Sequence, residues 1–118
     1  MKTSLALLLL FSTSVLAQSD PRYCGPPARD DKNKIMRSQD VKIAFQALYA
    51  CPSTGSHSGA CPGWAKDHVI PLACGGCDSV QNLQWLRNQI KSCAGIYCKD
   101  RWERKVYCTK SNNPQGKQ

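Results

Sequence analysis

Three residues of this chain have the side-chain types that phosphodiester hydrolysis requires: Asp67, His68 and Asn82. An imidazole can take a proton from water near neutral pH. A carboxylate is a natural ligand for a hard divalent ion, which neutralises charge on phosphorus and on the leaving oxygen. We therefore expect His68 to act as the general base and Asp67 to bind a metal ion, while the amide of Asn82 holds the intervening loop.

The sequence around these residues resembles a known nuclease motif. DHVIPLACGG at residues 67–76, followed by NLQWL at 82–86, is similar to the HNH, or ββα-metal, motif. The likeness to small HNH endonucleases of secreted and phage-type origin covers roughly residues 30–108. It implies an α+β fold: a small disulfide-rich single domain with a ββα-metal core and additional helices. It also implies a metal-dependent endonuclease of low sequence specificity, acting on DNA, with RNA as a further candidate substrate, and leaving 5′ phosphates.

The resemblance also suggests further site residues. In most members the asparagine at the position of Asn82 braces the loop, and in some its oxygen also contacts the metal, so both a catalytic and a metal-binding role stay open. The family's third ligand, a histidine, falls at Lys91, and a protonated lysine does not bind metals. Some relatives carry an acid slightly later, so KDRWER predicts Asp100 as a second carboxylate ligand with Glu103 behind it. Salt bridges to neighbouring arginines are the alternative for these two acids.

The predicted cofactor is one divalent ion, Mg²⁺ or Mn²⁺ first, with Zn²⁺ and Ca²⁺ as alternatives. Asp67 and His68 are adjacent, and neighbours on a regular strand point to opposite faces. We therefore expect the strand to end or twist at this pair, shortly before Pro71. The alternative for Asp67 is a surface pair with Lys66 or Lys99, which would contribute little to stability.

The chain is basic, with a formal net charge of +8, which suits a polyanionic partner. The candidate contacts to nucleic acid are Lys66, Arg101, Arg104 and Lys105. Phosphate contacts of this kind position the backbone and do not read sequence. A solvated basic face is the alternative for each. At the level of the whole chain, the alternatives are a non-enzymatic, cationic, disulfide-rich polyanion-binding protein and an HNH fold that has lost activity with its third ligand.

Eight cysteines in a small exported chain indicate a disulfide framework. The candidates are Cys24, Cys51, Cys61, Cys74, Cys77, Cys93, Cys98 and Cys108. A bridge between Cys51 and Cys61 would close the Gly/Ser/Pro-rich loop at 51–63, and Cys24 would tie down an irregular amino-terminal arm. A four-cysteine zinc site built from the cysteines at 74, 77, 93 and 98 is the alternative use of these thiols.

Residues 1–17 have the charge and apolar run of a secretory signal peptide. We expect one domain over 18–108 and a flexible polar tail over 109–118. The expected destination is secreted or periplasmic. The expected partner is a nucleic acid substrate, with no membrane contact after signal removal and a monomeric chain.

Local patterns predict the elements that must position these residues. Ser38 is a plausible helix N-cap, and apolar residues at helical spacing predict a helix over 39–50. A strand is expected over 64–70, a loop containing Gly75 and Gly76 over 71–81, and a second strand over 83–85. Helical segments are expected over 86–91 and 99–107. This order of strand, loop, strand and helix is the one that the HNH resemblance implies.

Overall fold

The computed structural model describes residues 20–108, so the predicted signal peptide and polar tail lie outside the described residues. Within them the chain is α+β, with three helices and one two-stranded sheet. The helices are α1 (Gln39–Leu48), α2 (Asn88–Lys91) and α3 (Lys99–Tyr107), and the strands are β1 (Trp64–His68) and β2 (Leu83–Arg87). Two short 3₁₀ turns, η1 (Leu72–Cys74) and η2 (Val80–Asn82), lie between the strands. The predicted helices and strands are confirmed, with boundaries shifted by a few residues.

The two strands pair antiparallel, from Trp64 opposite Arg87 to His68 opposite Leu83. Strand β1 ends at His68, two residues earlier than predicted. The Val69 amide still donates to the Asn82 carbonyl at 2.8 Å, so the chain leaves the sheet gradually. The early end of β1 places the Asp67–His68 pair at the sheet margin, where a strand termination was expected.

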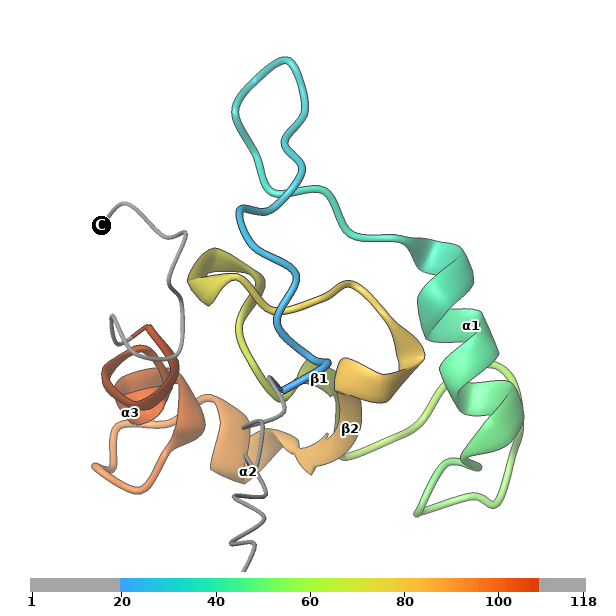
Figure 1. Ribbon diagram of the computed structural model, residues 1–118. Helices are drawn as coiled ribbons and strands as arrows, with labels where there is room; N and C mark the ends of the chain where they lie inside the picture. Colours follow the sequence, from blue (N-terminus) through green and yellow to red (C-terminus); the bar gives the residue numbers. More distant parts are fainter. Residues whose placement is uncertain (1–19, 109–118) are drawn as a thin grey trace, which may run out of the picture.

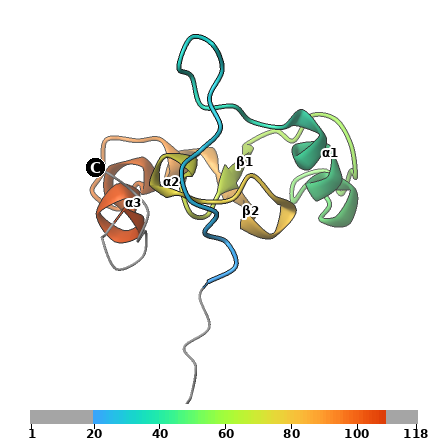
Figure 2. The ribbon, with the colours of Figure 1, turned by 45° about the horizontal axis from the view of Figure 1, so that its top comes forward.

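The sheet lies in the middle of the molecule, with α1 on one side and α3 on the other (Figures 1 and 2). Ser38 caps the amino-terminal end of helix α1: its Oγ accepts from the Val41 amide at 3.2 Å, so the predicted N-cap is confirmed. Phe45 of α1 packs against Trp85 of β2, with ring centroids 5.5 Å apart. Among residues 20–108 the buried apolar side chains are few: Phe45, Ile70, Pro71, Leu72 and Leu83, with the cysteines at 51, 74, 77 and 98.

All eight cysteines are bonded in pairs: Cys24–Cys77, Cys51–Cys61, Cys74–Cys108 and Cys93–Cys98. The predicted disulfide framework and the closed 51–63 loop are therefore confirmed. The alternative zinc site was wrong, because its four cysteines belong to three different bridges and carry no thiolate. Four bridges with so small a core are typical of proteins that leave the reducing cytosol. Among residues 20–108, no helix has the length and apolar character needed to cross a bilayer.

The loop that joins the strands is held by close backbone packing. Gly75 ends η1 with φ +91°, a conformation that residues with a Cβ rarely adopt. At Gly76 the constraint is space: a Cβ there would lie 2.0 Å from the Ile70 carbonyl oxygen and 2.8 Å from the Asn82 Nδ2. Glycine is therefore required for its positive φ at Gly75 and for its lack of a Cβ at Gly76.

We expect Gly76→Ala to lower the free energy of unfolding by about 1–3 kcal/mol or more, because the methyl group meets fixed backbone. Chemical denaturation of the oxidised protein measures the change. Gly55→Ala is the control, since Gly55 has φ +72° and nothing within 4 Å of its Cβ position. Its backbone strain should amount to about 1–2 kcal/mol at most. An effect at Gly76 no larger than the one at Gly55 would contradict the packing argument.

Candidate active site

A pocket of about 390 Å³ lies where the end of β1, the loop after it and helix α3 meet. Asp67 and His68 both line it, although they are consecutive on β1. The remaining lining residues are Ile35, Arg37, Lys42, Lys66, Pro71, Leu72, Ala73, Lys91, Glu103 and Arg104. Five of the lining side chains are basic and two are acidic, so the pocket is suited to an anion.

The imidazole of His68 has one firm partner. Its Nε2 lies 2.9 Å from Asp78 Oδ1, and the side chain is 11% exposed. An ionised carboxylate only accepts hydrogen bonds, so Nε2 carries a proton, and in the neutral form of the ring the lone pair is then on Nδ1. A neutral imidazole oriented in this way can take a proton from water at Nδ1.

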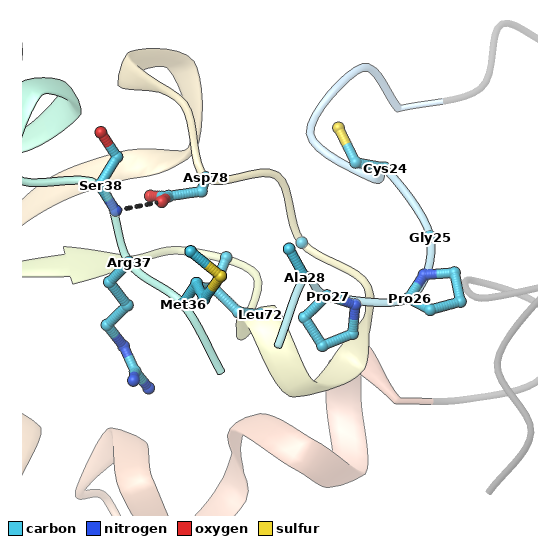
Figure 3. Close-up of a pocket in the computed structure, with 11 residues that line it drawn as sticks. Cys24, Gly25, Pro26, Pro27, Ala28, Met36, Arg37, Ser38, Leu72 and Asp78 are labelled. Carbon is cyan, nitrogen blue, oxygen red and sulfur yellow. Dashed lines mark hydrogen bonds between the residues drawn. The ribbon is translucent and has the colours of Figure 1, made fainter. Parts of the chain in front are cut away.

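Asp78 was not among the predicted site residues, yet it connects His68 to helix α1. Its second oxygen accepts from the Ser38 amide at 2.6 Å (Figure 3). Burial by itself raises the pKa of Asp78, but the hydrogen bonds from Ser38 and His68 outweigh this and hold the pKa below its ordinary value. Asp78 therefore stays ionised near neutral pH and can orient the ring. The only signal in the sequence was a carboxylate ten residues after the histidine, which is weak by itself.

A second cavity, of about 460 Å³, lies beside Asp78. The amino-terminal arm from Cys24 to Ala28 forms one wall, and Met36, Ser38 and Gly76 contribute to the rest. Arg37 and Leu72 line both cavities, and the side chain of Arg37 extends away from the Ser38–Asp78 bond (Figure 3). The arm is held there by Cys24–Cys77, and the Cys24 amide donates to the Gly75 carbonyl at 2.7 Å.

Asp67 is 4% exposed and surrounded by donors. Its Oδ1 lies 3.0 Å from Lys91 Nζ, and its Oδ2 lies 3.0 Å from Lys99 Nζ and 3.1 Å from Gln84 Nε2. Burial raises the pKa of Asp67, but these three partners together lower the pKa below its ordinary value. The alternative for Asp67 was an ion pair with Lys66 or Lys99 on the surface. The pair with Lys99 is present, but it is buried.

The two acids predicted on α3 have different surroundings. Glu103 lines the pocket and pairs with Lys99 one helical turn earlier. Asp100 is 42% exposed, accepts from Ser92 Oγ at 2.6 Å and lies 3.4 Å from Lys91 Nζ. Asp100 follows Lys99 by one residue, about 100° further around the helix, and its carboxylate is held by Ser92 and Lys91 instead. The structure brings Glu103 to the pocket with Asp67 and His68, and it places Asp100 outside the lining.

Asn82 is fully buried and binds only the backbone of the loop. Its Oδ1 accepts from the Ile70 amide at 2.9 Å, and its Nδ2 donates to the carbonyls of Ile70 and Cys77 at 2.9 and 2.8 Å. Of the two roles left open for Asn82, this geometry is that of the loop brace. The side chain of Asn82 does not line the pocket.

The predicted nucleic-acid contacts divide into two groups. Lys66 and Arg104 line the pocket, whereas Arg101 and Lys105 do not. Arg101 is exposed and its Nε donates to the Cys93 carbonyl at 3.4 Å. Three basic residues that line the pocket were missed, namely Arg37, Lys42 and Lys91. Only the fold brings these distant positions together.

The predicted divalent ion does not fit the carboxylates as they stand. Both oxygens of Asp67 and one oxygen of Glu103 already lie against lysine ammonium groups. Within residues 20–108, no group of three or more His, Cys, Asp or Glu side chains is arranged to hold a metal ion. A divalent ion at Asp67 would have to displace at least one lysine.

Comparisons with known proteins add no family assignment: no protein-family model, no curated protein and no solved structure matches this chain.

Proposed function

We propose that this chain is a nuclease of the HNH type that hydrolyses phosphodiester bonds in DNA, and in RNA as a further substrate, at low sequence specificity. The observation that carries the proposal is the His68–Asp78 hydrogen bond at the margin of a basic pocket. It supplies a base with a defined tautomer beside a place suited to phosphate. In this proposal water loses its proton to His68 Nδ1 and attacks phosphorus, and the basic lining holds the phosphate.

The electrostatics of the pocket lining support an anionic ligand. The pKa of Lys66 lies below its ordinary value, first because of burial and second because Lys42 is close by. When an anion binds between two ammonium groups that line a pocket, its negative charge offsets the repulsion between them. Contacts of this kind do not read bases, which agrees with the proposed low specificity. Export from the cell, in line with the four disulfides, completes the proposal; a divalent cofactor stays a prediction of the sequence.

A non-enzymatic polyanion-binding protein is the second candidate, and the same basic lining favours it. It gives no role to the oriented imidazole, because binding a polyanion needs positive charge and no base. The two candidates therefore differ in whether the bound nucleic acid is cut.

The deciding experiment incubates the oxidised protein with supercoiled plasmid, single-stranded DNA and RNA, each with Mg²⁺, with Mn²⁺ and with EDTA. We expect nicked plasmid and 5′-phosphate ends in at least one of these conditions. Binding that falls with salt, together with intact nucleic acid in every condition, would reject the nuclease and support the polyanion-binding protein.

We expect Asp78→Asn to lower kcat by at least about tenfold with little change in KM, because the ring of His68 loses the acceptor that fixes its tautomer. The backbone N–H of Ser38 can still donate to the side-chain oxygen of the asparagine that replaces Asp78, so the thermal midpoint should change little. Asp31→Asn is the control, since Asp31 is exposed and does not line the pocket. A kcat equal to that of the wild type would remove Asp78 from the mechanism.

A further inference from the structure

The ammonium of Lys99 is enclosed by oxygens. Lys99 is 3% exposed, and its Nζ lies 2.9 Å from the His68 carbonyl oxygen and 3.0 Å from Asp67 Oδ2, with Glu103 Oε2 as the third partner. A lysine ammonium has three donors, so each of its N–H bonds has a partner. Two carboxylates and one carbonyl around a single point are also the oxygen ligands that a hard cation selects.

The positions in the chain explain why these groups meet. Lys99 and Glu103 are four residues apart, on one face of α3, while Asp67 and His68 end β1. The Cys74–Cys108 bridge joins the turn after β1 to the end of α3. The ammonium thus lies between the helix and the sheet margin, on the inner side of the two carboxylates that line the pocket.

A second ammonium lies on the pocket side of the same carboxylate. Lys91 Nζ is 3.0 Å from Asp67 Oδ1, and Lys91 lines the pocket. Burial by itself lowers the pKa of Lys91, but the hydrogen bond that Lys91 donates to Asp67 and the negative charges of Asp67 and Asp100 together raise the pKa above its ordinary value, so Lys91 is charged throughout the neutral range. Asp67 therefore contacts two ammonium groups: that of Lys99, which is buried outside the pocket lining, and that of Lys91, which lines the pocket where a phosphate would bind.

We propose that Lys99 and Lys91 take the place of a divalent ion at this site, so that the hydrolysis proceeds without a metal. This inference rests on the proposed nuclease function. The buried ammonium of Lys99 offsets the negative charges of Asp67 and Glu103, which keeps the pocket favourable to an anion. Lys91 contacts the phosphate and stabilises the charge that develops on its oxygens.

The chemical step balances without a metal. A bond forms between the water oxygen and phosphorus as the bond from phosphorus to the leaving 3′ oxygen breaks, and the water proton passes to His68 Nδ1. The leaving oxygen takes a proton from solvent water, and the hydroxide so formed is neutralised by the proton that His68 releases. Lys91 stays charged throughout, so its contribution is electrostatic.

The first test measures plasmid cleavage by metal-stripped protein in EDTA and again in excess Mg²⁺ or Mn²⁺. We expect the two rates to agree within about threefold, and Lys91→Met to lower the EDTA-resistant rate by about a hundredfold, the scale of one lost electrostatic contact. Lys91→Arg should keep part of that rate. Cleavage that EDTA abolishes and Mg²⁺ restores would overturn the inference while leaving the nuclease function intact.

The second test needs no activity. The thermal midpoint of the wild type should not change with millimolar Mg²⁺, Mn²⁺, Ca²⁺ or Zn²⁺, whereas Lys99→Ala, which vacates the oxygens, should gain a metal-dependent rise. Lys32→Ala is the matched control and should gain none, because Lys32 is exposed and does not line the pocket. A metal-dependent rise in the wild type would overturn the inference even if Lys99→Ala fails to fold. Failure of the nuclease function would show separately, as the absence of cleavage in every condition.

Discussion

His68→Ala should lower the rate of nucleic acid cleavage by at least about a hundredfold, the scale of losing a general base. His68 lines the pocket, and the Nε2 bond to Asp78 leaves Nδ1 as the proton acceptor. The measurement is the initial rate of plasmid nicking at saturating protein. The fold should survive, because the ring makes one side-chain hydrogen bond and the four disulfides are untouched.

The chain contains a matched control for this variant. His57 lies exposed in the 51–63 loop, where its Nδ1 is 2.9 Å from the Ala47 carbonyl oxygen. His57→Ala should therefore cleave at the rate of the wild type. Added imidazole should restore part of the activity of His68→Ala, since a free base can enter the vacated space. A His68→Ala protein that keeps more than about a tenth of the rate would show that the base is another group.

Asn82→Ala should lower the free energy of unfolding by about 3 kcal/mol or more, because each buried group left without a partner costs about 1–3 kcal/mol. The substitution leaves three backbone groups unpaired: the amide of Ile70 and the carbonyls of Ile70 and Cys77. The measurement is urea unfolding of the oxidised protein, where the midpoint should fall while the slope stays unchanged.

Asn88→Ala is the control for Asn82, since Asn88 is exposed at the start of α2. Asn82→Asp should destabilise the protein at least as much as Asn82→Ala, because a fully buried carboxylate would have one donor, the Ile70 amide, and would face the two carbonyl oxygens that Nδ2 now binds. An Asn82→Ala midpoint equal to that of the wild type would contradict the bracing role. Cleavage should fall together with stability, because the braced loop begins immediately after His68.

Much of the fold could be predicted from local patterns. Apolar spacing and the Ser38 cap locate α1, and the segment KDRWER locates α3, because helix signals repeat within a few residues. The Cys51–Cys61 bridge followed from a short loop with turn-forming composition. Cys24–Cys77 and Cys74–Cys108 could not be derived, because they join segments that only the folded chain brings together, and the local Cys93–Cys98 pair was not singled out.

The site was predictable only in part, for the same reason. His68 and Asp67 stand out because they are adjacent and belong to a motif. The role of Asp78 depends on the Ser38 amide, forty residues earlier in the chain, which no sequence spacing reveals. Lys91 was recognised as a departure from the HNH pattern, but the location of its ammonium against Asp67, and the burial of Lys99 beneath it, required coordinates.

The Cys74–Cys108 bridge has a consequence for the cell that makes this protein. One part of the pocket lining comes from the end of β1 and its following turn, and another part comes from α3, which this bridge fastens at its end. In a reducing cytosol the fastening is missing, so the two parts need not meet. In the exported nuclease that we propose, the chain would therefore be incomplete while it shares a compartment with the nucleic acids of its producer, and oxidation after export would complete the pocket.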